Sequence, residues 1–318
     1  MDSKSHYCDR REFVKKLVTA SCLTFTPLTV CSLFSEQAFA KENSAQHPLL
    51  LAKRITKKGK SLGLKQLIES NIKKKRKTGL LTKREKTGWS FRNLDSGAYL
   101  ATINAEVPMQ CASMEKPFLA QLYFHDVKAG RRRYTRESKR MMILMLQYSN
   151  NHATNWFFKQ LGGPRKVERR LKKHYGHVYR HIHLVEHIPR GGKAYRNKVA
   201  PNDYSRFLYY LWHNKFPYSK TLKNMMRLPN NDRIDKGIYG GRNHVLVYNK
   251  TGTTAMLCGD MGIVHIKDPH GKTFTYSMAG AIESTIIQSP YTKWARSRGR
   301  IIIEVSKLAY HYAVKSYL

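Results

Sequence analysis

The segment Cys111-Ala112-Ser113-Met114-Glu115-Lys116-Pro117-Phe118 begins an apolar run and places a serine three residues before a lysine. On a helix, positions i and i+3 share one face, so the Ser113 hydroxyl and the Lys116 amine can meet. A serine hydroxyl needs an adjacent base at neutral pH, and lysine serves only when burial or another cation lowers its pKa. S-x-x-K also occurs on ordinary helix surfaces, so the pair needs further motifs before it indicates a nucleophilic serine.

Two further motifs follow in order along the chain. The first is Ser149-Asn150-Asn151, and the second is Lys250-Thr251-Gly252, which follows the apolar run Val245–Val247. The ordered set S-x-x-K, S-x-N and K-T-G resembles the serine β-lactamase and penicillin-binding-protein superfamily. The spacing between the motifs is closest to that of the class A β-lactamases, and the resemblance runs from about residue 88 to the C-terminus.

The resemblance implies an α/β (α+β) fold of the β-lactamase/transpeptidase type. It would contain a five-stranded antiparallel sheet flanked by helices and an all-helical subdomain at about residues 130–240, with the active site between them. Hydrophobic patterning independently indicates a mixed α/β protein with a sheet built from both ends of the chain. The predicted strands are 89–93, 98–103, 245–247, 261–266 and 273–281, and the predicted helices are 62–75, 112–130, 137–160, 164–174, 203–212, 221–226 and 302–318.

The superfamily's catalytic roles transfer to matching positions of this sequence. Ser113 would be the acylating nucleophile, with Lys116 as its activating partner. Ser149 would relay a proton to the leaving nitrogen, and Asn151 would hydrogen-bond the amide side chain of the substrate. A second cation near Lys116, such as Lys250, would lower the pKa of that lysine on electrostatic grounds alone.

The third motif would bind the substrate. Lys250 and Thr251 would hold its carboxylate, and Gly252 would let its backbone lie close to the strand. The resemblance also implies an oxyanion hole made by the backbone N–H groups of Ser113 and Thr253, which would stabilise the tetrahedral intermediate.

Several positions depart from the class A pattern. Asn150 replaces the usual aspartate, which predicts a weaker local helix cap with unchanged chemistry. The glutamate that activates the deacylating water falls on Glu186, but the asparagine expected four residues later is Arg190. Leu184 and Asn197 occupy the places of the arginine–aspartate bridge that braces this loop. Glu186 is therefore either the deacylation base or an ordinary surface glutamate.

One competing motif overlaps this loop. His183-Leu184-Val185-Glu186-His187 matches H-x-x-E-H, an inverted zincin pattern, with His174, His177 and His181 nearby. Zinc would need both histidines on one helix and a distant third ligand. Pro189 and the arginine-rich surroundings argue against such a helix, so we favour a histidine cluster at a basic surface and expect neither a metal nor an organic cofactor.

The N-terminus has the features of a bacterial signal peptide. Asp9-Arg10-Arg11-Glu12-Phe13-Val14-Lys15 precedes an apolar run from Leu17 to Phe34 and the A-x-A sequence Ala38–Ala40. Paired arginines before a phenylalanine suggest the twin-arginine route. We therefore predict a signal peptide at 1–40, a basic arm at 41–87, a hydrolase domain at 88–318, and a periplasmic or extracytoplasmic location without a stable membrane span.

The chain is strongly basic. It has 318 residues, with 58 Lys+Arg against 21 Asp+Glu and a net charge of +37. Such a charge favours anionic partners, and export makes an envelope polymer a better candidate than nucleic acid. A generally basic, soluble surface is the open alternative. After cleavage Cys111 and Cys258 would remain, either as a disulfide or as two buried thiols.

These observations predict an exported serine hydrolase that opens a β-lactam amide through an acyl-enzyme on Ser113. The nearest alternative is a penicillin-binding, D-Ala-D-Ala-directed peptidase or transpeptidase of the cell wall. Two further alternatives are a catalytically inert, basic envelope-binding protein and a zinc metallopeptidase. Turnover and adduct formation with a β-lactam would separate them.

Overall fold

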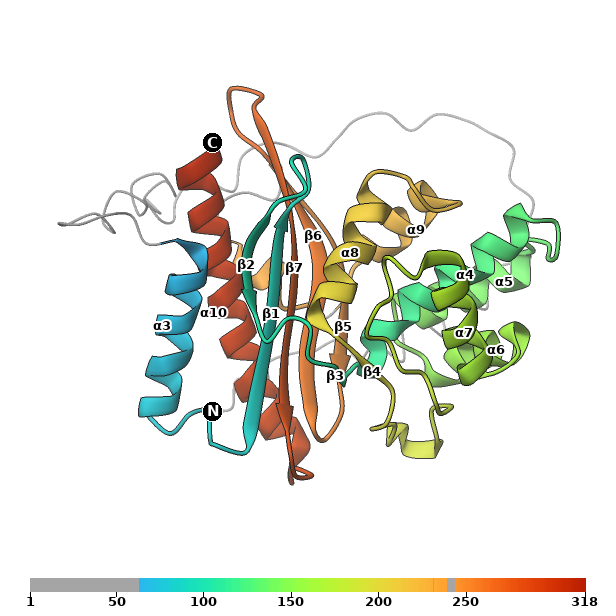
Figure 1. Ribbon diagram of the computed structural model, residues 1–318, viewed down its shortest axis with the longest axis horizontal. Helices are drawn as coiled ribbons and strands as arrows, with labels where there is room; N and C mark the ends of the chain where they lie inside the picture. Colours follow the sequence, from blue (N-terminus) through green and yellow to red (C-terminus); the bar gives the residue numbers. More distant parts are fainter. Residues whose placement is uncertain (1–62, 231, 239–243) are drawn as a thin grey trace, which may run out of the picture. The chain divides into compact units, whose positions relative to one another are not determined.

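The computed structural model describes residues 63–230, 232–238 and 244–318. The centre of the fold is a five-stranded antiparallel sheet in the order β2-β1-β7-β6-β5 (Figure 1). The strands are β1 (Glu85–Asn93), β2 (Tyr99–Ile103), β5 (Val245–Thr253), β6 (Leu257–Lys267) and β7 (Thr273–Ser284). The predicted sheet is confirmed. The predicted signal peptide and residues 41–62 of the predicted basic arm lie outside the described residues.

The sheet joins the two ends of the chain because β1 pairs with β7. In that pairing Trp89 lies opposite Gly280, and the Trp89 side chain is fully buried. A Cβ at Gly280 would collide with the Trp89 ring, so the glycine lets the indole lie flat against the sheet.

One face of the sheet is covered by α3 (Leu64–Lys77) and α10 (Tyr291–Tyr317), which pack against each other (Figure 1). Helix α3 buries Leu64, Ile68 and Ile72, whose four-residue spacing forms one apolar stripe. The predicted domain start at residue 88 falls inside β1, and α3 belongs to the same packed layer. Residues 64–87 are therefore part of the folded domain.

The other face carries α8 (Pro201–Trp212) and a group of helices. These are α4 (Lys116–Lys128), α5 (Arg136–Leu146), α6 (Asn151–Leu161), α7 (Pro164–Tyr175) and α9 (Ser219–Met226). A two-stranded sheet of β3 (Met109–Gln110) and β4 (Lys198–Val199) joins the segment before α4 to the segment before α8. The sequence did not predict this short pair, because two residues carry no alternation to recognise.

Two predicted helices differ from the structure. The single helix predicted at 137–160 is divided into α5 and α6, and Ser149 between them has φ of 57°, in the left-handed region that ends a helix. The last helix begins at Tyr291 rather than near residue 302. Its first part is rich in Arg and lacks a continuous apolar stripe, although Trp294 and Ala295 are buried.

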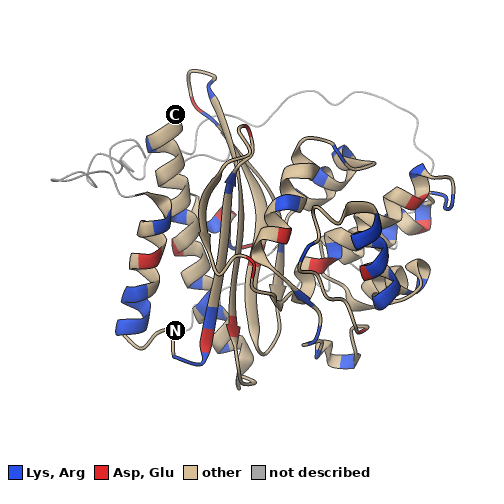
Figure 2. Ribbon diagram, in the orientation of Figure 1, with Lys and Arg blue, Asp and Glu red and all other residues tan. Residues whose placement is uncertain are grey.

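Basic side chains lie mainly on helices, and α7 is the clearest case (Figure 2). It buries Val167 and Leu171 and carries Lys and Arg on most of its other positions. Among the described residues, no helix has the length and apolar content needed to cross a membrane.

In the part of the chain that the structure describes, Cys111 and Cys258 are buried free thiols, so the suggested disulfide between them is wrong. Cys111 lies in the core between the sheet and the helical group, and Cys258 lies in the core beneath α10. The Cys258 thiol donates to Ala295 O at 3.4 Å. The two thiols belong to opposite faces of the sheet and cannot reach each other.

Candidate active site

Ser113 lies in the 3₁₀ turn η1 (Ala112–Glu115), directly before α4. The preceding Ala112 has φ of 45°, a conformation that side chains with a Cβ rarely adopt. Among the described residues the Ser113 hydroxyl has no hydrogen-bond partner, and Ser113 borders a cavity. The strained turn therefore presents an unengaged hydroxyl to open space.

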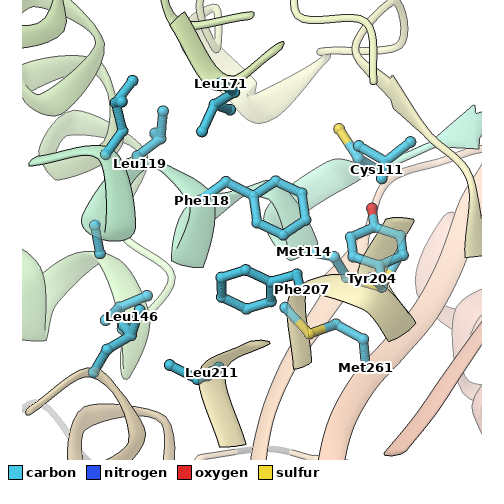
Figure 3. Close-up of a cluster of buried hydrophobic side chains, with 14 of the residues drawn as sticks. Cys111, Met114, Phe118, Leu119, Leu146, Leu171, Tyr204, Phe207, Leu211 and Met261 are labelled. Carbon is cyan, nitrogen blue, oxygen red and sulfur yellow. The ribbon is translucent and has the colours of Figure 1, made fainter. Parts of the chain in front are cut away.

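The apolar core behind the turn holds this geometry in place. Phe118, two residues beyond Lys116, packs against Phe207 of α8 at a ring-centroid distance of 4.9 Å and against Tyr204 (Figure 3). It also contacts Tyr179. Pro117 lies in the first turn of α4, where its missing N–H costs no helical hydrogen bond.

Gly252 of β5 lies directly against this turn. A Cβ at Gly252 would come within 2.9 Å of Cys111 O and 3.2 Å of the Ala112 Cβ. The glycine thus lets the K-T-G strand approach the S-x-x-K turn, which is a packing role in addition to the predicted role towards substrate.

Lys116 is fully buried, and its amine faces the second motif. Its Nζ donates to Ser149 O at 2.6 Å, to Ser149 Oγ at 3.2 Å and to Asn151 Oδ1 at 3.2 Å. Burial lowers the pKa of Lys116 well below its usual value, and the charge of Lys250 lowers it further, as predicted, while Glu115 opposes the shift. The lowered pKa favours the neutral form of the Lys116 amine, which is the form that can accept a proton.

Lys250 reaches the same hydroxyl from the sheet side. Its Nζ donates to Ser149 Oγ at 3.1 Å and to Thr251 O at 3.0 Å. Its pKa is lowered to about 8, mainly by burial and also by Arg233, although Asp260 opposes the change. Ser149 Oγ thus contacts both lysine amines, an arrangement that suits the predicted proton relay.

The helix that follows Ser149, α6, is well capped at its N-terminus. Asn150 is the N-cap of α6, and its Oδ1 accepts a hydrogen bond from Ala153 N at 2.8 Å. The expected weakening of the cap is absent because asparagine and aspartate cap helices almost equally well.

A cavity of about 430 Å³ brings the three motifs together. From the motifs and the strand end it is lined by Ser113, Ser149, Asn151, Thr251 and Thr253, and from the facing loop by residues that include Ile188, Lys193, Tyr195 and Asn197. Lys116, Lys250 and Gly252 lie behind this lining. The Thr253 hydroxyl accepts from Arg233 Nη2 at 2.8 Å. The oxyanion hole stays a prediction.

Among the cavity-lining residues that sequence reasoning missed are Tyr291 and Glu115. Tyr291 comes from the start of α10, far from every motif, and no local signal points to it. Glu115 lies inside the S-x-x-K motif itself, and its position one residue before Lys116 was the available signal. Its side chain is only 1 % exposed but borders the cavity.

Glu186 is oriented differently from the prediction. It does not line the cavity, and its Oε1 accepts a hydrogen bond from Arg196 N at 2.6 Å. The loop is braced by Asn197, whose Oδ1 accepts from Val185 N at 2.8 Å and Glu186 N at 3.0 Å, and whose Nδ2 donates to Glu186 O at 3.0 Å. This buried amide does the bracing expected of an arginine–aspartate bridge. Arg190 is exposed.

The H-x-x-E-H segment forms no helix. His183 and His187 are therefore not presented one turn apart, as the zinc motif requires. Among the residues that the structure describes, no group of His, Cys, Asp and Glu is placed to hold a metal ion.

Solved structures with the same fold include PBP-A and several β-lactamases. A point mutant of PBP-A, solved as an acyl-enzyme complex with penicillin G, is 21% identical with a TM-score of 0.63, covering 79% of this chain and 96% of that one. An ancestral class A β-lactamase (GNCA) is 17% identical with a TM-score of 0.62, covering 77% and 98%. A β-lactamase from Xanthomonas campestris is 16% identical with a TM-score of 0.63, covering 78% and 98%.

At these identities the likenesses show the fold alone. No curated protein matched the sequence. The family model for the β-lactamase enzyme family, Beta-lactamase2, matches residues 136–312, which is more than half of the chain and includes the second and third motifs. With the fold and the site already in agreement, this match shows that the chain belongs to the β-lactamase enzyme family.

Proposed function

We propose that this protein is a serine hydrolase that opens a β-lactam amide through an acyl-enzyme on Ser113. One observation carries the proposal. The amines of two buried lysines meet at the Ser149 hydroxyl, beside a cavity that Ser113 borders with an unengaged hydroxyl. A surface S-x-x-K pair would have neither the burial nor the second cation that make lysine a base.

The chemistry follows from this arrangement. Neutral Lys116 accepts the proton of the Ser113 hydroxyl as the serine oxygen attacks the lactam carbonyl carbon. When the carbon–nitrogen bond breaks, the Ser149 hydroxyl passes a proton to the leaving nitrogen and is resupplied by a neighbouring lysine. Charged Lys250, with Thr251, attracts the carboxylate of the substrate. The product of this half-reaction is an ester on Ser113.

A penicillin-binding protein that acylates and then stalls is the second candidate. It is favoured by the position of Glu186, which lies outside the cavity lining with its carboxylate engaged by Arg196. A peptide substrate ending in D-Ala-D-Ala would be handled by the same acylating groups.

One experiment tests the proposal. Purified protein is mixed with a chromogenic cephalosporin, and both colour change and intact mass are followed. We expect continuous turnover with a transient covalent adduct that peptide mapping places on Ser113. A single burst with a stable adduct supports the penicillin-binding candidate instead, and the absence of any adduct rejects both.

We also propose that the protein acts outside the cytoplasm. The support is the N-terminal sequence, in which paired arginines precede an apolar run and an A-x-A sequence ending at Ala40.

A basic concave surface on the helical group is our candidate for an anionic envelope polymer. It is lined mainly by Arg131, Arg132, Lys166, Arg170 and Lys173, with Asp126 as its one acidic side chain. The Asp126 carboxylate is already engaged by arginines, and Lys166 and Lys173 have no ion-pair partner among the described residues. The two lysines are therefore available to anionic groups.

The double change Lys166→Glu and Lys173→Glu is expected to lower the salt concentration at which the protein elutes from a heparin column, used here as a polyanion probe. Each lost contact should reduce the slope of log affinity against log salt by about 1. The matched control is Lys267→Glu with Lys272→Glu on the exposed β6–β7 turn, which changes the net charge equally. Equal effects of both pairs would show that only net charge matters.

A further inference from the structure

Glu115 is a buried carboxyl group that the proposed acylation does not use. Its side chain is 1 % exposed, and it borders the same cavity as Ser113. Buried carboxylates are normally paired with a cation or a metal. The Glu115 carboxyl instead accepts hydrogen bonds from two neutral groups. Cys111 Sγ donates at 2.9 Å, and Asn197 Nδ2 donates at 3.0 Å. The neighbouring Lys116 amine donates to the second motif instead.

Both donors contact the same carboxyl oxygen, Oε2. The other oxygen, Oε1, has no hydrogen-bond partner among the described residues, and it is not completely buried. Because Glu115 borders the cavity, Oε1 is the oxygen available to a water molecule there. Two hydrogen bonds therefore fix one oxygen of the carboxyl group, and the other oxygen is accessible to a water molecule in the cavity.

The electrostatic environment suits a base. The pKa of Glu115 is raised to about 7, mainly by burial and also by the charge of Glu186, against the lowering effects of Cys111, Lys116 and Asn197. A general base works best when its pKa lies near the working pH. Glu186 is less suitably placed, because it does not border the cavity and its Oε1 is bound to Arg196 N.

We propose that Glu115 binds and activates the water that hydrolyses the acyl-enzyme on Ser113. This inference rests on the proposed function. Glu115 Oε1 accepts a proton from water as the water oxygen attacks the ester carbonyl carbon. The bond between that carbon and Ser113 Oγ then breaks, the proton passes to the serine oxygen, and the ring-opened acid leaves. Asn197 and Cys111 fix the orientation of the carboxyl, so the loop brace and the catalytic group share one hydrogen-bond network.

The test compares Glu115→Gln with Glu186→Gln, using a chromogenic cephalosporin and time-resolved intact mass. Glutamine keeps an acceptor for Cys111 and Asn197 but cannot take a proton. We expect Glu115→Gln to acylate within a few-fold of the unmodified rate and to lose the adduct roughly 100-fold or more slowly. Glu186→Gln should lose the adduct at nearly the unmodified rate. Adduct loss at the normal rate in Glu115→Gln, or trapping in Glu186→Gln, overturns the inference.

Two further measurements separate catalysis from a structural effect. Deacylation by the unmodified protein should increase with pH through about 7, as Glu115 ionises, and Glu115→Gln should lose that dependence. Glu115→Asp should recover part of the rate, because it restores a carboxylate. A stable adduct on the unmodified protein would refute the role of Glu115 in deacylation, but the proposed acylation on Ser113 would still stand. An unmodified protein that forms no adduct refutes both proposals.

Discussion

Ser113→Ala is expected to abolish both adduct formation and β-lactam turnover, a loss of at least about 10⁴-fold in rate. The substitution removes the only atom of this side chain that can form the ester. Among the described residues the hydroxyl has no hydrogen-bond partner, so its removal breaks no interaction of the resting protein. Intact-mass spectra after incubation with a chromogenic cephalosporin provide the measurement.

The matched control is Ser96→Ala, in the exposed turn between β1 and β2, which should acylate normally. Thermal unfolding of Ser113→Ala should match that of the unmodified protein. A persistent adduct on Ser113→Ala would mean that another side chain is the nucleophile.

Lys116→Met is expected to slow acylation by about 10³-fold, within the usual contribution of a general base. Methionine has a similar length but cannot accept a proton, and it is compatible with a fully buried position. Replacing a buried ionisable group by an apolar one is often neutral or stabilising, so the variant should fold. Stopped-flow measurement of adduct formation gives the rate.

The pH profile provides a second measurement on the same variant. Lys116 has a lowered pKa, so its neutral, basic form increases as pH rises through that value, and acylation should increase with it. Lys250 loses its charge above pH 8, because its pKa is about 8, and binding of the substrate carboxylate should weaken there. The pH profile of acylation by Lys116→Met should lack the rise that depends on Lys116 and keep the decrease above pH 8 that depends on Lys250. An unchanged acylation rate would assign the role of base to another group.

Much of the fold was predictable because its patterns are local. Alternating residues in β1 and β2 and the apolar run of β5 gave the strands, and the three ordered motifs gave the superfamily with its five-stranded sheet. The division of α5 from α6 was not predictable from periodicity. Apolar spacing continues across the break, and the left-handed conformation of Ser149 is imposed by its surroundings.

The sequence by itself determined which side chains carry the proposed acylation. The proposed chemistry requires two serines and two lysines, and short motifs in the sequence contain them directly. The structure brings these residues together around one cavity. Only the tertiary structure decided which carboxyl group faces that cavity. Pairing of β3 with β4 brings Asn197 to Glu115, and Arg196 holds Glu186 away. Motif spacing cannot encode this choice, because the contacts join segments about 80 residues apart, and burial of the Glu115 carboxyl exists only after they pack.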